Sequence, residues 1–137
     1  MNEVVGALLV SLDDQVILQR RDGNTPYCPH MLGLFGGSVE PDENVYHAMR
    51  RELTEESSLD VPQLQLGLPV EQEFCGSKFY LFRMLIPVVE FEVKEGAGAE
   101  IYTAQEALSR SDTTRSVRFM LRREIEQDIT VFTRQTA

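Results

Sequence analysis

The feature that most constrains this chain is a predicted helix whose apolar row continues into carboxylates. It lies in residues 36–59, which read GGSVEPDENVYHAMRRELTEESSL. We predict a helix over about 43–57 with Asp42 as its N-cap residue, because a short side chain with a free oxygen can accept hydrogen bonds from the unpaired amides of the first turn. Glu43 then places negative charge at the positive end of the helix dipole.

The row turns from apolar to acidic without changing sides of the helix. Its positions, spaced by three or four residues, are Val45, Ala48, Met49, Glu52, Glu55 and Glu56. Carboxylates that lean toward an interior lose hydration and repel each other unless a cation compensates. Mg²⁺ and Mn²⁺ prefer such oxygen ligands. Spacing alone leaves open an ordinary helix with surface glutamates, in which Arg51 and Glu55 form an i,i+4 pair.

The full spacing resembles the Nudix box. Gly37 is followed after five residues by Glu43, and after seven more by RELTEE at 51–56. So many fixed positions at fixed spacing make a specific motif, which covers 37–59. The resemblance implies an α/β fold of the Nudix type, an α/β/α sandwich in which the box helix and a C-terminal helix flank a mixed central sheet.

The resemblance also implies a metal site. Four residues match metal ligands of the family: the carbonyl of Gly36 and the carboxylates of Glu52, Glu55 and Glu56. They would hold Mg²⁺, with Mn²⁺ as a substitute. Arg51 of the box is expected to orient the glutamates rather than to contact substrate.

The general base has three candidates. One is Glu55 of the box. MutT-like members of the family carry a Lys-Glu-Gly loop before a short strand, and Glu95 is the matching residue here, with Glu100 as the fallback. A solvated loop carboxylate is the alternative interpretation of Glu95.

Two adjacent arginines are candidates for binding substrate. Arg20 and Arg21 follow the apolar stretch VILQ at the end of a predicted strand. A guanidinium group can bind phosphate oxygens in a bidentate manner. The alternative is a strand end with solvated cations, and the sequence does not separate the two residues.

The remaining sequence predicts strands and helices around the box. Strands are expected over 4–12, 15–20, 32–35 and 78–87, with an edge strand over 88–93 and helices over 104–109 and 113–131. The near-continuous apolar run in 78–87 predicts burial on both faces.

The box departs from the family pattern at its end. Ser58 replaces a glycine at a position where a left-handed backbone is often needed, and keeping that conformation would cost about 1 kcal/mol. A different exit from the helix is the alternative. Since no ligand is lost, activity is expected to survive.

Length and composition narrow the class of protein. The 137 residues fit one Nudix domain over 1–137. The net charge of −9 disfavours binding to a nucleic acid polymer. No apolar run approaches the ~20 residues that span a bilayer, so no membrane partner is expected. Two cysteines and no basic leader indicate a cytoplasmic protein.

These features predict a Mg²⁺-dependent hydrolase that cleaves a phosphoanhydride bond in a nucleoside diphosphate linked to another group. The substrate would be a (deoxy)nucleoside triphosphate or a nucleotide sugar. The alternative is a non-catalytic module of the same fold that senses a nucleotide. Homodimers are common in the family, and this sequence leaves a homodimer open.

Overall fold

β1 (Asn2–Ser11) is the strand on which the sheet is built, and its nearly unbroken apolar sequence accounts for its burial. It runs parallel to β6 (Ser77–Ile86) over its whole length. A parallel pair needs a long crossover, and the connecting segment here includes α1 (Val45–Glu56). The computed structural model describes residues 2–25, 27–87 and 91–136.

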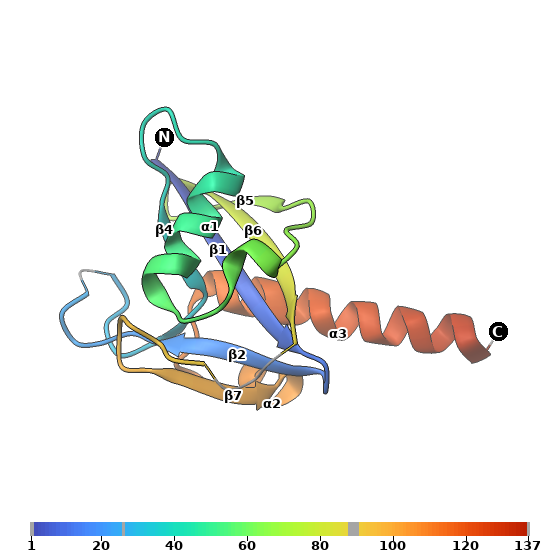
Figure 1. Cartoon of the computed structure of the whole chain (residues 1–137). Coiled ribbons are helices and arrows are strands. Elements are labelled where there is room, and N and C mark those ends of the chain that lie inside the picture. Colours follow the sequence, from blue (N-terminus) through green and yellow to red (C-terminus); the bar gives the residue numbers. More distant parts are fainter. Residues whose placement is uncertain (1, 26, 88–90, 137) are drawn as a thin grey trace.

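The other edge of β1 is shared by two strands. β4 (Phe35–Ser38) pairs with the first half of β1 and β2 (Gln15–Arg20) with the second half, both antiparallel. β2 also pairs with β3 (Leu32–Gly33) and β7 (Ala99–Thr103), and β5 (Val70–Phe74) pairs with β6. Figure 1 shows β4 and β2 diverging along β1. The end of β2 and the start of β4 therefore lie where the sheet divides.

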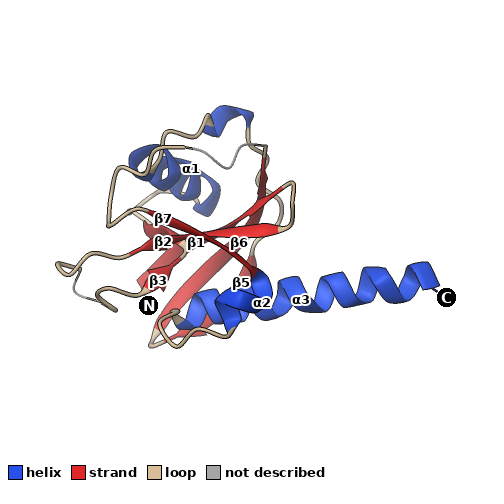
Figure 2. Ribbon diagram, turned by 90° about the horizontal axis from the view of Figure 1, so that it is seen from below, coloured by secondary structure: helices blue, strands red, loops and turns tan. Residues whose placement is uncertain are grey.

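Helices cover both faces of this mixed sheet. Figure 2 shows α1 on one face, with α2 (Ala104–Leu108) and α3 (Arg115–Thr136) on the other. The predicted α/β/α sandwich is thus confirmed. No helix in the described ranges has both the length and the hydropathy needed to span a bilayer.

The two cores follow from the alternation of side chains along β1. Val5, Ala7 and Leu9 pack on the α1 side, and Leu8 and Val10 pack on the α3 side. The α1 core includes two residues of the predicted helical row, Ala48 and Met49, together with Leu53. This packing fixes α1 against the sheet, so the residues at its C-terminal end have a defined position.

The box helix begins later than predicted. α1 starts at Val45, and its N-cap is Asn44 rather than Asp42, because the Asn44 side chain accepts a 2.8 Å hydrogen bond from the amide of His47. Asp42 lies in the preceding turn with a φ of 65°, a left-handed conformation that aspartate adopts more readily than most residues.

Several other boundaries differ in detail. The strand expected over 32–35 is divided into β3 and β4, and the helix expected over 113–131 ends at Thr136. The strand over 78–87 is confirmed as β6, but its burial on both faces is wrong because Arg83 and Leu85 are exposed on the α3 side. Of the edge strand expected over 88–93, residues 88–90 lie outside the described residues. At 91–93 there is an isolated bridge between Val93 and Ser57.

Candidate active site

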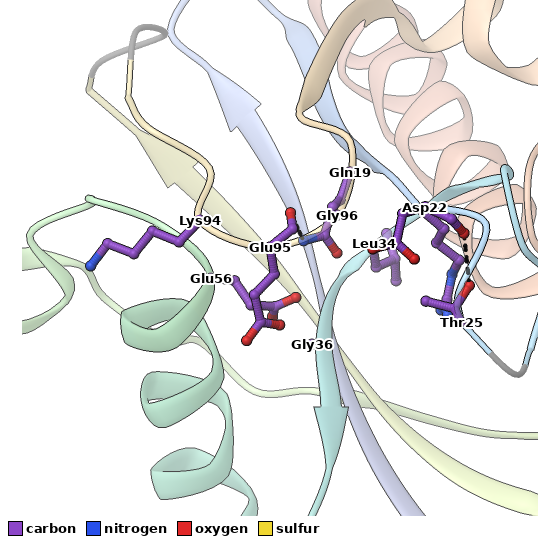
Figure 3. Close-up of a pocket in the computed structure, with 10 residues that line it drawn as sticks. Gln19, Asp22, Thr25, Leu34, Gly36, Glu56, Lys94, Glu95 and Gly96 are labelled. Carbon is purple, nitrogen blue, oxygen red and sulfur yellow. Dashed lines mark hydrogen bonds between the residues drawn. The ribbon is translucent and has the colours of Figure 1, made fainter.

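A cleft of about 520 Å³ opens where the sheet divides. Its walls come from the end of β2, the start of β4, the C-terminal end of α1 and the loop before β7 (Figure 3). The predicted site residues among its lining are Arg21, Gly36, Glu56 and Glu95. The fold therefore brings together residues that are widely separated in sequence.

Glu56 is the most perturbed group in the cleft. It is only 3% exposed, and its Oε1 has no hydrogen-bond partner among the described residues. Burial, reinforced by the negative charges of Glu52 and Glu95, raises its pKa to about 8, although hydrogen bonds from Gln19 and the Gly36 amide oppose the shift. Figure 3 shows the side chains of Glu56 and Glu95 among those that line the cleft. A buried carboxylate with a free oxygen is suited to a cation.

Arg51 organises the other carboxylates of the box. Its guanidinium donates to Glu43 at 2.8 and 3.0 Å and to Glu52 at 3.0 Å. It also lies 3.4 Å from Glu55 and donates to the Ser38 carbonyl at 3.0 Å. The hydrogen bond from Arg51 lowers the pKa of Glu43 to about 2. Arg51 thus joins α1 to the loop that precedes it.

Gly37 leaves the space that Glu52 occupies. A Cβ atom at Gly37 would lie 2.5 Å from Oε1 of Glu52, too close for any real contact. The Glu52 side chain is only 12% exposed, and burial raises its pKa. The requirement for glycine in the box follows here from the carboxylate that packs against it.

The two arginines have different environments. Arg20 donates to Glu100 at 2.6 and 2.8 Å and to Asp112 at 2.9 Å. Arg21 lines the cleft, and its buried Nε has no hydrogen-bond partner among the described residues. Arg20 is therefore engaged by the protein itself, whereas Arg21 retains a donor. Glu100 is likewise engaged, and its pKa is lowered by the hydrogen bond from Arg20.

The residues present fit a divalent metal in charge and donor type. Oε1 of Glu56 is buried without a hydrogen-bond partner among the described residues, and the carboxylates of Glu52 and Glu95 lie near enough to raise the pKa of Glu56. In residues 2–25, 27–87 and 91–136 no group of three or more His, Cys, Asp or Glu side chains is arranged so that it could hold a metal ion. Glu52 and Glu55 pair with Arg51 in this structure.

Gln19 is a cleft residue that sequence reasoning missed. It is 8% exposed, and its amide donates to the Glu95 carbonyl at 3.2 Å. The available signal was a polar side chain next to the buried run Val16-Ile17-Leu18 of β2. Buried polar groups need partners, so a glutamine at the end of such a strand indicates a polar neighbour.

Comparison with known proteins agrees with this fold and box. A family model described as the NUDIX domain matches residues 2–128. The chain therefore belongs to the Nudix hydrolase family.

Individual relatives match the chain over a shorter stretch or at low sequence identity. It is 43% identical over 63 residues to the m7GpppN-mRNA hydrolase NUDT17 of Bos taurus, a match that covers 46% of this chain and 21% of that protein. The structure resembles DR0079 from Deinococcus radiodurans with a TM-score of 0.77 and 22% identity, covering 89% of this chain and 82% of the other. It also resembles the E. coli dihydroneopterin triphosphate pyrophosphohydrolase, with a TM-score of 0.73 and 21% identity, covering 88% of this chain and 92% of the other. At these identities the structural matches show the fold alone.

Proposed function

We propose that this chain is a Mg²⁺-dependent pyrophosphohydrolase that cleaves a phosphoanhydride bond in a nucleoside diphosphate linked to another group. The observation that carries the proposal is the buried carboxylate of Glu56. One of its oxygens has no hydrogen-bond partner among the described residues, and the negative charges of Glu52 and Glu95 raise its pKa. A bound cation would offset the cost of burying that charge. Mn²⁺ is the expected substitute.

Four groups would hold the metal: the carboxylates of Glu52, Glu55 and Glu56 and the carbonyl of Gly36. A divalent ion supplies a more acidic bound water and neutralises phosphate charge. To join Glu56, the carboxylates of Glu52 and Glu55 have to turn away from Arg51. Arg51 keeps its two hydrogen bonds to Glu43 in that event, so its position is preserved.

Glu95 is the favoured general base. Glu100 is bound by Arg20, and Glu55 is half exposed beside Arg51, whereas Glu95 lines the cleft. In the proposed step a water oxygen attacks phosphorus and Glu95 accepts the water's proton. The anhydride P–O bond breaks, and its electron pair leaves with the departing phosphate.

The substrate class follows from the cleft and from Arg21, which lines it and whose Nε has no partner among the described residues. The Arg21 guanidinium would bind a substrate phosphate. A (deoxy)nucleoside triphosphate or a nucleotide sugar is the first choice. An mRNA cap is a second candidate, because the matching part of the bovine relative belongs to a protein described as a cap hydrolase.

The test is hydrolysis by the purified protein with Mg²⁺, against triphosphates, nucleotide sugars and a cap analogue. Glu56→Gln should lower kcat by at least about 100-fold, since it removes a metal ligand, and Glu73→Gln on exposed β5 is the matched control. No phosphate release from any substrate would favour the nucleotide-sensing module, and full activity of Glu56→Gln would exclude the proposed site.

Two further expectations remain predictions. They are a single domain over 1–137 and a cytoplasmic location, with a homodimer left open. Cys28 and Cys75 are both exposed free thiols, which is consistent with a reducing compartment.

A further inference from the structure

Ser58, which replaces the glycine of the box, uses its side chain to hold the segment that leads to Glu95. Its Oγ accepts a 2.7 Å hydrogen bond from the Glu92 amide, and its own amide donates to the Glu92 carbonyl at 2.9 Å. Two residues further on, the Lys94 amide donates to the Glu56 carbonyl at 2.7 Å. A glycine at position 58 could not make the first of these bonds.

The serine is not held in a strained conformation. Ser58 is not among the described residues with positive φ, so the left-handed backbone that glycine favours is absent here. The exit from α1 is extended instead, with φ of −144° and ψ of 165° at Ser57. This extended exit is what allows residues 56–58 to pair with residues 92–94.

Gln19 holds the same loop from the opposite side. Its amide donates to the Glu95 carbonyl at 3.2 Å and also hydrogen-bonds the Glu56 carboxylate. Beside it the Ala97 amide donates to the Arg20 carbonyl at 2.8 Å. A Cβ at Gly96 would lie 2.7 Å from that carbonyl. The loop is thus pressed against β2 on one side and tied to α1 on the other (Figure 3).

These contacts hold together two segments that each carry an acidic side chain into the cleft. Glu56 and Glu95 are near enough to interact electrostatically, and repulsion between their ionised forms would drive the loop away from α1. We propose that Ser58 and Gln19 are positioning residues, which hold the 92–97 loop so that Glu95 stays opposite Glu56. The catalytic consequence rests on the proposed function, whereas the effect on the loop does not.

Amide hydrogen exchange measured by NMR directly tests the clamp, by which we mean the hydrogen bonds that Ser58 and Gln19 make to the 92–97 loop. In Ser58→Ala and Ser58→Gly the Glu92 and Lys94 amides should exchange roughly five- to tenfold faster, the change expected for one lost hydrogen bond. Gln19→Met, which keeps the side-chain volume, should do the same at Ala97. Thr54→Ala is the matched control, because among the described residues the Thr54 hydroxyl bonds the Arg50 carbonyl of its own helix and nothing in the loop. Unchanged exchange in both Ser58 variants would overturn the proposal.

Kinetics then test the positioning role. Ser58→Ala and Gln19→Met should each lower kcat roughly fivefold with KM little changed, and calorimetry should show weaker Mn²⁺ binding in Gln19→Met. Faster exchange with unchanged kcat in both variants would overturn the positioning role. If the wild-type protein hydrolyses no substrate, the proposed function fails, and the exchange rates still decide whether the clamp exists.

Discussion

Arg20 and Arg21 show how strongly two adjacent residues of one type can differ in role. The Arg20 guanidinium donates hydrogen bonds to Glu100, to Asp112 and to the His30 carbonyl. Arg21 leaves a buried Nε without a partner in the described part of the chain. A buried donor without an acceptor is costly, and a substrate oxygen in the cleft would satisfy it.

We therefore expect Arg20→Ala and Arg21→Ala to affect different quantities. Arg21→Ala should raise KM about tenfold or more, because a charge-assisted bond to phosphate contributes roughly 1.5–3 kcal/mol. Arg20→Ala should instead lower the free energy of unfolding by about 1–3 kcal/mol, since it leaves Glu100 without its ion-pair partner and leaves Asp112 with Arg110 alone. Steady-state kinetics and thermal unfolding of both variants check this. Equal changes of KM in the two variants would contradict it.

The sequence predicted that an arginine of this pair binds substrate, but it could not say which. The deciding partners of Arg20, Glu100 and Asp112, are 80 and 92 residues away in sequence. Glu100 as a fallback base could not be judged for the same reason. Within the box, by contrast, the sequence was enough to place the acidic residues. The i,i+3 and i,i+4 spacing alone puts Glu52 and Glu56 at one end of an apolar row.

At the scale of elements, the junction of β4 and α1 depends on Gly37. The Glu52 carboxylate fills the space where a side chain at position 37 would lie. Because no positive φ is recorded for Gly37, an alanine is compatible with its backbone. The effect of a substitution should therefore act through Glu52 rather than through strain.

Gly37→Ala should displace Glu52 and weaken Mn²⁺ binding by about tenfold or more, the usual effect of disturbing a metal ligand. Calorimetric titration with Mn²⁺ checks this. Gly67→Ala is the control, because a Cβ at Gly67 would meet no described atom within 4 Å. Equal Mn²⁺ affinity in the two variants would show that Glu52 is not held by this contact.

Most of the elements were predicted, but β5 and β7 were not among the expected strands, and the ends of the predicted elements were less accurate. Apolar periodicity identified the strands around 4–12 and 15–20 and the helices around 104–109 and 113–131, because burial of one face dominates such patterns. The N-cap was misplaced because Asp42 and Asn44 are both good caps, and local sequence does not decide between them. The contacts of Ser58 and Gln19 with the loop at 92–97 were not predictable, since they join segments that are 34 and 76 residues apart in sequence.

At the scale of the whole molecule, the burial of Glu56 makes stability depend on pH and metal. The pKa of Glu56 is about 8 in the folded protein, against an ordinary value of 4.5. The folded state therefore binds more protons than the unfolded state between these values, and metal-free stability falls as pH rises from about 4.5 to 8. Burial raises the pKa of Glu52 as well, which adds to the same trend. The lowered pKa of Glu43 affects stability only at pH values below about 4.5, outside this range.

Glu56→Gln should remove most of this dependence in metal-free protein. Because glutamine resembles the protonated carboxyl, the variant should match the wild type near pH 5 and exceed it at pH 8.5 by on the order of 2–4 kcal/mol. Urea unfolding across this pH range in the presence of EDTA checks the difference. Added Mn²⁺ should reverse the order at pH 8.5, since only the wild type gains binding energy at Glu56. A variant no more stable than the wild type at pH 8.5 in EDTA would mean that the Glu56 carboxylate is not buried without compensation.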